Sequence, residues 1–290
     1  MGKQFSPVQG AQLVVVSGAS SGIGEDSALF LNGLGYTVAA GVRRPEDGER
    51  LRSSAPHPDR LHPLIFDVTD DEQVDGARRV VEGLVAGGPR FAGVFSNAGI
   101  AMMAGDTSSE GTSMAALERT MAVNFFGAVR FIRAFLPMAR ASNGRVIVNS
   151  ALMAKTVLPF NAGYAASKRA LEGWCDSLRR EVEPHGVRVV LIEAAAISTS
   201  LTASHGTVSA DNPYPEQLAF HEWANARAAP HRDDPKCAPR RFSELVAHGL
   251  QVPRPKARYQ VGGGARAISI VGDLPVGLQD RLMRRLVASR

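Results

Sequence analysis

The stretch from Ser17 to Gly24, which reads SGASSGIG, decides the fold of this chain. An apolar run, LVVVS at Leu13–Ser17, precedes it, and an amphipathic helical pattern follows it. Gly18 permits a tight turn, Gly22 lets the backbone approach a ligand, and Gly24 lets the helix pack closely on the sheet. The unpaired N–H groups at the start of that helix favour a phosphate. The stretch therefore predicts a strand, a phosphate-binding turn and a helix, as in a dinucleotide-binding unit.

The same order of strand, turn and helix repeats along the chain. The strands are short apolar runs without alternation, which is typical of parallel strands buried on both faces of a sheet. We predict a single α/β domain over residues 1–290, with a Rossmann-type, doubly wound parallel sheet. The expected strands are Leu13–Ser17, Thr37–Val42, Leu61–Asp67, Gly93–Ser96, Arg145–Ser150 and Val187–Glu193. The expected helices are about Ile23–Leu34, Leu117–Arg140, Tyr164–Glu183 and one that Asp70 caps and that ends near Ala86.

The pattern changes after the sixth strand. Residues 197–256 are rich in Pro, His, Asn and charge, so we expect them to form a cover over the substrate. Ala257–Gly262 is expected to form a last short strand, and residues 274–290 a C-terminal amphipathic helix. We expect this helix to dock on the body of the protein or on a second subunit. Its leucines and arginines leave a peripheral membrane contact as the alternative.

Composition and charge restrict the class of protein. The two cysteines, Cys175 and Cys237, lack metal-binding spacing, so we expect no metal site, no disulfide framework and a cytoplasmic location. The net charge is +5, and from Arg227 onward there are 13 Lys and Arg against 5 Asp and Glu. We interpret this excess as a solvated basic surface, with attraction of anionic substrates or lipid headgroups as the alternative. No nucleic-acid-binding motif or membrane span is apparent in the sequence.

The end of the second expected strand indicates which dinucleotide binds. An acidic residue there would bind the ribose hydroxyls of NAD and repel the 2′-phosphate of NADP. Gly41 occupies that position, and Arg43 and Arg44 follow it. Because arginine binds phosphate through a planar fork of donors, we predict NADP(H), with Ser20 as a further contact. The alternative for either arginine is that it faces solvent.

Several motifs together resemble those of the classical short-chain dehydrogenase/reductase family, over about Leu13–Thr199. SGASSGIG is similar to its glycine turn, Ser96–Gly99 to its NNAG strand end, and YAASK at Tyr164–Lys168 to its YxxxK motif. The C-terminal region looks more like the retinol and hydroxysteroid dehydrogenase branch. The resemblance implies catalytic roles for Tyr164, Lys168 and Asn124. It implies cofactor contacts at Gly18, Ser20, Gly22, Ile23, Gly24, Arg43, Arg44, Asp67, Val68, Asn97, Ala98, Gly99, Tyr164, Lys168, Ile197 and Thr199.

The chemistry of Tyr164 and Lys168 follows from their spacing, because residues four apart share one face of a helix. An ammonium at Lys168 would favour the phenolate and lower the pKa of Tyr164 toward neutrality. Tyr164 could then exchange a proton with a carbonyl or alcohol oxygen while a hydride moves to or from the nicotinamide. Asn124, on a neighbouring helix, is expected to hold a water that relays the proton.

Two positions depart from the family pattern. The family has a catalytic serine thirteen residues before the tyrosine, where this chain has Ala151. Ser150 is adjacent, but a shift of one residue along a strand points a side chain to the opposite face, and only a bulge would bring it round. The family also has a Pro-Gly pair after the sixth strand, where this chain has EAAAIST at Glu193–Thr199. Its absence predicts a shifted cofactor or a looser loop.

Three functions remain open. The favoured one is an NADP(H)-dependent oxidoreductase acting on a carbonyl or secondary alcohol of a small hydrophobic or biosynthetic substrate. Ser150, Ser198, water or the substrate itself would then replace the missing serine. The second is a cyclase, isomerase or lyase that uses Tyr164 as acid or base, and the third is a cofactor-binding protein without catalysis. The resemblance also implies a homodimer or homotetramer formed through the helices that carry Asn124 and Tyr164, with Phe125, Phe131, Leu171 and Trp174 as contact candidates.

Overall fold

The computed structural model describes residues 5–101, 108–198, 216–220, 222 and 234–288. Its centre is a seven-stranded sheet in the order β3-β2-β1-β4-β5-β6-β7, in which every neighbouring pair is parallel. The order reverses between β1 and β4, so the ligand crevice of this doubly wound sheet is expected at their carboxyl ends. The predicted fold is confirmed. The strands are β1 (Gln12–Val16), β2 (Thr37–Val42), β3 (Leu61–Ile65), β4 (Arg90–Ser96), β5 (Arg145–Ala151), β6 (Arg188–Ala194) and β7 (Arg258–Val261).

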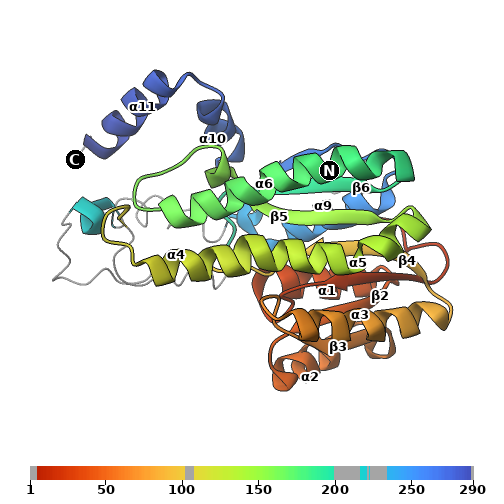
Figure 1. The fold of residues 1–290 in the computed structure, drawn as a ribbon. Coiled ribbons are helices and arrows are strands. Elements are labelled where there is room, and N and C mark those ends of the chain that lie inside the picture. Colours follow the sequence, from red (N-terminus) through yellow and green to blue (C-terminus); the bar gives the residue numbers. More distant parts are fainter. Residues whose placement is uncertain (1–4, 102–107, 199–215, 221, 223–233, 289–290) are drawn as a thin grey trace.

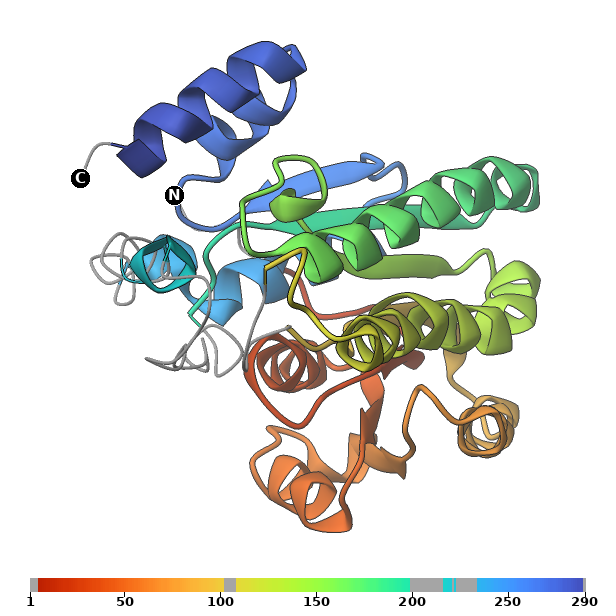
Figure 2. The same cartoon turned by 60° about the vertical axis from the view of Figure 1, so that its left-hand side comes forward.

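Helices cover both faces of the sheet (Figure 1, Figure 2). The unbroken apolar run in β1 is explained by this arrangement, because Leu13 and Val15 pack in one core cluster and Val14 and Val16 in the other. Asp70 caps α3 as expected, with its side chain accepting from the Gln73 N–H. On one face lie α3 (Asp71–Ala86), α5 (Ala128–Ser142) and α6 (Ala162–Val182), and on the other lie α1 (Gly22–Gly33), α2 (Pro45–Ser53) and α9 (Pro239–Gln251).

The expected helix at Leu117–Arg140 is part of one long helix with an irregular centre. It consists of α4 (Met114–Met121), a π-helical turn at Ala122–Gly127 and α5. By length and composition alone, Met114–Ser142 could cross a membrane. However, Phe131 and Phe135 on this helix are fully buried in the core beneath it. We therefore interpret its apolar character as that of a core helix.

The predicted substrate cover at residues 197–256 was wrong for its last part. Residues 239–251 form α9, on which Phe242, Val246 and Ala247 are fully buried. Phe242 packs against Phe95 of β4 at 5.7 Å between ring centroids, so α9 belongs to the core. Residues 199–215, 221 and 223–233 of the predicted cover lie outside the described residues.

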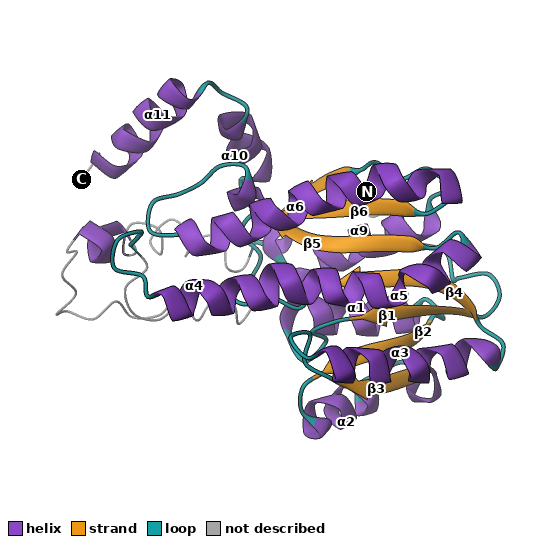
Figure 3. Ribbon diagram, viewed as in Figure 1, coloured by secondary structure: helices purple, strands orange, loops and turns teal. Residues whose placement is uncertain are grey.

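The C-terminal region ends in two further helices, α10 (Ala265–Gly272) and α11 (Val276–Ala288). The last strand, β7, and a C-terminal helix were both predicted. In Figure 3, α11 stands away from the helices that cover the sheet. Val276 and Leu278 on α11 are exposed. The expected docking of this helix on the body of the protein is therefore not seen for these two residues.

Candidate active site

The glycine turn lies at the carboxyl end of β1, directly before α1. Gly18 has φ of 65°, and a Cβ there would lie 2.8 Å from the Cα of Ala98. A Cβ on Gly24 would overlap the carbonyl oxygen of Gly18. Only glycine fits such positions without strain. The Ser21 side chain makes no capping bond to α1, which leaves the first-turn N–H groups for a phosphate. The turn therefore fits a dinucleotide, as the sequence predicted.

The end of β4 is tied to this turn by side chains. Ser17 Oγ accepts from the backbone N–H groups of Asn97 and Ala98, at 2.9 and 3.1 Å. Asn97 Nδ2 donates to the Gly18 carbonyl at 2.9 Å, and Asn97 Oδ1 accepts from Asn149 of β5 at 2.9 Å. The predicted contact residues Asn97 and Ala98 are thus held against the predicted phosphate turn.

The structure separates the two arginines that follow β2. Arg44 donates from Nε and Nη2 to Asp47 at 2.9 and 3.2 Å, so its fork is engaged on α2. Arg43 is exposed, and none of the ion pairs between described residues includes it. Burial raises the pKa of Asp67, but hydrogen bonds from Thr69 and the nearby charge of Arg43 outweigh burial and lower it. Arg43 is therefore the better placed of the two for a 2′-phosphate.

Two further observations near β2 were not foreseen from the sequence. A Cβ on Gly41 would lie 2.4 Å from the ring of Phe66, so a side chain at this position would require that ring to shift. Arg50 of α2 donates from Nη2 to the carbonyl oxygen of Ser20 at 2.5 Å and pairs with Glu25. This places a cation beside the glycine turn. The only sequence signal was that Arg50 lies on the helix that follows the two arginines.

The three predicted catalytic residues come together at the carboxyl end of β4. Lys168 Nζ donates to the Asn149 carbonyl at 3.0 Å and lies 5.8 Å from the centroid of the Tyr164 ring. A Cβ on Gly99 would lie 3.3 Å from Asn124 Oδ1 and 3.6 Å from Lys168 Nζ. The helix α6, the π-helical turn and the end of β4 thus lie around one small space.

Asn124 is fully buried, and its side chain holds the chain beyond β4 in place. Its Oδ1 accepts from the Ile100 N–H at 2.8 Å, while Nδ2 donates to the Ile100 carbonyl and to Ser167 Oγ, at 2.9 and 3.0 Å. Both amide hydrogens are therefore used. The side chain can contact the expected relay water only through Oδ1. Carbonyls of the π-helical turn offer a second route, because such turns break the regular helical hydrogen bonding.

Burial acts on the pKa of Tyr164 in the direction opposite to the predicted effect of Lys168. Burial raises the pKa of Tyr164 to about 12 and lowers that of Lys168 to about 8. Desolvation disfavours the charged form of each group, and the ammonium does not hydrogen bond to the phenol. At neutral pH Tyr164 is therefore a protonated phenol. It is poised to donate a proton to a carbonyl oxygen rather than to accept one from an alcohol.

The lowered pKa of Lys168 leads to an expected pH dependence. Lys168 is charged below pH about 8 and neutral above it. A neutral amine cannot stabilise the phenolate that forms when Tyr164 gives up its proton. We expect kcat/KM for carbonyl reduction to be constant below pH about 8 and to fall above it, toward tenfold per pH unit. In Lys168→Arg, the fall should move to higher pH. An unchanged profile in that variant would contradict this assignment.

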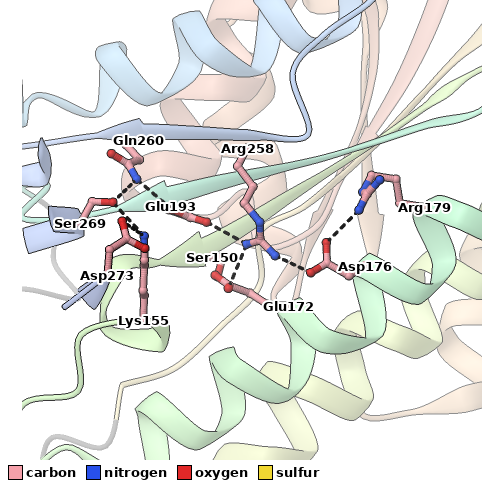
Figure 4. A network of polar contacts seen from close by, with 10 residues as sticks. All are labelled: Ser150, Lys155, Glu172, Asp176, Arg179, Glu193, Arg258, Gln260, Ser269 and Asp273. Carbon is pink, nitrogen blue, oxygen red and sulfur yellow. Dashed lines mark hydrogen bonds and ion pairs between the residues drawn. The ribbon is translucent and has the colours of Figure 1, made fainter. Parts of the chain in front are cut away.

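Ser150 does not replace the missing serine. The pairing of β5 with β6 is regular up to Ala151, so no bulge turns Ser150 toward the cleft. Its Oγ donates to Glu172 Oε1 at 2.6 Å, on the side of the sheet covered by α6. Figure 4 shows this hydroxyl within a buried polar network. As expected, the shift of one residue along β5 points Ser150 away from the cleft. Ser150 therefore has a structural role.

Arg258 of β7 is the centre of that network (Figure 4). Its Nη1 donates to Glu172 at 3.0 Å and to Glu193 at 2.8 Å, and its Nη2 donates to Asp176 at 2.7 Å. The side chains of Glu172 and Glu193 are only 8% and 5% exposed, so a single guanidinium pairs with two buried carboxylates. The network joins β5, β6, β7 and α6 beneath the candidate site.

The turn after β6 is held in place without a Pro-Gly pair. The Ala195 N–H donates to the Val261 carbonyl at 2.8 Å, and the Gly263 N–H donates to the Ala196 carbonyl at 3.2 Å. Ile197 is buried beside Gly262. The expectation of a shifted cofactor or a looser loop stays a prediction. Thr199, a predicted cofactor contact, lies outside the described residues.

The fold and this site are typical of α/β oxidoreductases. A family model described as short chain dehydrogenase matches residues 12–208. The chain therefore belongs to the short-chain dehydrogenase family of oxidoreductases, as the motifs indicated.

Individual relatives agree with this assignment. The chain is 33% identical over 273 residues to the uncharacterized oxidoreductase YbbO of Escherichia coli, covering 93% of each protein. It is 37% identical over 193 residues to estradiol 17-beta-dehydrogenase 2 of Mus musculus, covering 66% of this chain and 49% of that protein. Its fold is similar to a crystal structure of a short chain dehydrogenase from Burkholderia cenocepacia J2315 in complex with NADP. That comparison has a TM-score of 0.73 and 25% identity, and covers 94% of this chain and 98% of the other.

Proposed function

We propose that this protein is an NADPH-dependent reductase of a carbonyl group on a small hydrophobic substrate. The observation that carries the proposal is the cluster of Tyr164, Lys168 and Asn124 beside a glycine turn that fits a dinucleotide. The protonated state of Tyr164 at neutral pH favours reduction over oxidation. The decisive experiment mixes the protein with NADPH and carbonyl compounds, follows the absorbance of the reduced nicotinamide, and identifies the products.

Different residues of this chain have different roles in such a reduction. Bound NADPH supplies the hydride that the carbonyl carbon receives. Tyr164 donates its proton to the carbonyl oxygen, and the ammonium of Lys168 stabilises the phenolate that remains. Asn124 holds the backbone at Ile100, and thereby the end of β4, against α6. The glycine turn and the N-terminus of α1 hold the phosphates.

A hydrophobic substrate is supported by the surroundings of the cluster. Phe160, directly before α6, packs against Phe220 with ring centroids 5.5 Å apart. Leu152 and Met153 follow the end of β5. The similarity to an estradiol dehydrogenase agrees with an apolar alcohol or ketone. Estrone and simple ketones such as cyclohexanone and acetophenone are therefore suitable first probes.

The cofactor preference should depend mainly on one arginine. NADPH is expected to bind more tightly than NADH, because Gly41 carries no acidic side chain and Arg43 is available for the 2′-phosphate. Arg43→Ala should weaken NADPH binding by about tenfold or more, which corresponds to roughly 1.4 kcal/mol. Arg44→Ala is the matched control and should have a smaller effect, since Arg44 is paired with Asp47. Fluorescence titration measures both, and equal affinities of the unmodified protein for NADPH and NADH would contradict the assignment.

A non-redox reaction is the second candidate, and Ala151 favours it. An oxyanion donor at this position contributes about 10²-fold or more to rate in comparable sites. A cyclase, isomerase or lyase could use Tyr164 as its acid and need no such donor. Product formation without oxidation of NADPH would support this candidate and would contradict the reductase.

We also propose that the protein forms a homodimer or homotetramer in the cytoplasm. Phe131 and Leu171 are buried in the core and cannot contact a second subunit, but Phe126 on the π-helical turn is exposed. Phe126→Arg should therefore shift the protein toward a monomer in analytical ultracentrifugation. A monomeric mass for the unmodified protein at micromolar concentration would refute the assembly. The two cysteines are unpaired, which agrees with a reducing compartment.

A further inference from the structure

The segment between the end of β5 and Tyr164 contains one polar side chain with an unusual partner. Asn161 is the N-cap residue of α6, yet its side chain makes no capping bond. Its Nδ2 instead lies 2.8 Å from the Sδ of Met153. A thioether sulfur is a weak acceptor, so a carbonyl oxygen would be a better partner for this amide.

This amide lies close in the chain to Tyr164 and contacts the turn that follows Ala151. Asn161 lies three residues before Tyr164, and residues three apart at a helix are neighbours. Met153 lies two residues after Ala151, in the turn with which β5 ends. The contact between Asn161 and Met153 therefore joins the start of α6 to the turn that follows Ala151, the position at which the family has its serine.

The neighbouring polar side chains are already committed to oxygen acceptors. Between residues 149 and 167, all of which the structure describes, five polar side chains other than Asn161 and Tyr164 donate to oxygen atoms. Asn149 donates to Asn97, Ser150 to Glu172, Lys155 to Ser269 and Asp273, Thr156 to the Ile268 carbonyl, and Ser167 to the Tyr164 carbonyl. Within residues 149–167, the amide of Asn161 and the phenol of Tyr164 are thus the side-chain donors left for a substrate oxygen.

The backbone before Asn161 is strained in a way that supports a functional role. Phe160 has φ of 58°, a region that a residue other than glycine rarely adopts. Such strain persists only when the surrounding structure enforces it, and it is frequent at active sites. Here the ring contact between Phe160 and Phe220 holds the turn. The strained turn sets the direction from which Asn161 enters α6.

We infer that Asn161 is the second hydrogen-bond donor to the substrate carbonyl and takes over the task of the absent serine. In the reduction, the carbonyl carbon gains the hydride and the oxygen gains the proton of Tyr164. Asn161 donates a hydrogen bond to that oxygen from Nδ2, leaves Met153 to do so, and is itself unchanged. The inference rests on the proposed reductase function.

The test is a set of variants at Asn161 and Ala151, with NADPH and the carbonyl probes named above. Asn161→Ala should lower kcat by about 10²-fold, with little change in NADPH affinity. Asn161→Asp should lower it similarly, because a carboxylate accepts hydrogen bonds but cannot donate them. Asp is also a good N-cap residue, so this variant should preserve the helix. Ser177→Ala, a change at an exposed position of α6, should leave kcat unchanged.

Rescue distinguishes a donor from a structural residue. Ala151→Ser should restore at least about tenfold of the lost kcat in the Asn161→Ala background, but raise kcat only slightly in the unmodified protein. Such dependence on background indicates that the two positions serve the same atom. Thermal unfolding and NADPH titration check that each variant folds and binds the cofactor. A merely structural role for Asn161 would not be rescued by a hydroxyl on β5.

Several results would overturn the inference. One is wild-type kcat in both Asn161 variants, and another is a loss that Ala151→Ser does not restore. A loss of activity in Ser198→Ala but not in Asn161→Ala would assign the donor to the other side of the cleft. If the unmodified protein binds NADPH but reduces no carbonyl probe, the proposed function fails and the inference fails with it. An active unmodified protein with an equally active Asn161→Ala overturns the inference alone.

Discussion

Tyr164→Phe is expected to lower kcat for carbonyl reduction by about 10²- to 10⁴-fold, because the proton donor is removed while the ring remains. Burial raises the pKa of Tyr164 to about 12, which keeps the phenol protonated at neutral pH. The measurement is the initial rate of NADPH oxidation with a carbonyl probe, together with product analysis. NADPH affinity should be nearly unchanged.

A suitable control for this variant is Tyr259→Phe on β7. The Tyr259 hydroxyl accepts from the backbone N–H of Lys256 at 2.9 Å, away from the catalytic cluster. This variant should retain activity. If Tyr164→Phe keeps more than a tenth of the unmodified rate, another group supplies the proton and the assignment of Tyr164 is wrong.

Arg258→Ala is expected to lower the free energy of unfolding by about 3–5 kcal/mol, because it leaves two buried carboxylates without their cation. Glu172 and Glu193 would both lose the guanidinium that pairs with them. Burial already raises the pKa of Glu172 despite Arg258. The loss should therefore be largest at neutral and alkaline pH. It should shrink as the pH falls, because protonated carboxyls need no counter-ion. Urea unfolding at several pH values measures both effects.

Arg241→Ala provides the matched control, since it removes the same charge from an exposed pair. Arg241 donates to Glu244 at 3.1 Å on the surface of α9. Exposed pairs of this kind contribute roughly 0–1 kcal/mol. If Arg258→Ala is no less stable than Arg241→Ala, the network in Figure 4 is not important for stability.

Features that depend on neighbouring residues could be predicted from the sequence. Asp70 caps its helix because the bond from the Gln73 N–H lies within one turn. Ser150 faces away from the cleft because side chains alternate along a strand. The glycine turn was recognised because the strand before it and the helix after it define its geometry.

Features that depend on distant parts of the chain could not be predicted in the same way. The spacing of Tyr164 and Lys168 places them on one helical face, but their pKa values depend on burial by other elements. The sequence alone does not distinguish the roles of Arg43 and Arg44. They differ because Asp47 of α2 pairs with Arg44. The sequence around α9 is rich in prolines and charges, which obscures its apolar face. The residues that contact α9 are on α1 and β4.

The Arg258 network also has a consequence for how the protein folds. Arg258 is 86 residues from Glu172 and 65 residues from Glu193 along the chain. Contacts across such separations form slowly, because a long loop must close before any interaction rewards it. An intermediate in which β1 to β6 are paired but β7 is not would contain two unneutralised acids beneath a nearly finished site. Docking of β7 is then the step that supplies their cation, so this strand is expected to be among the last elements to pack.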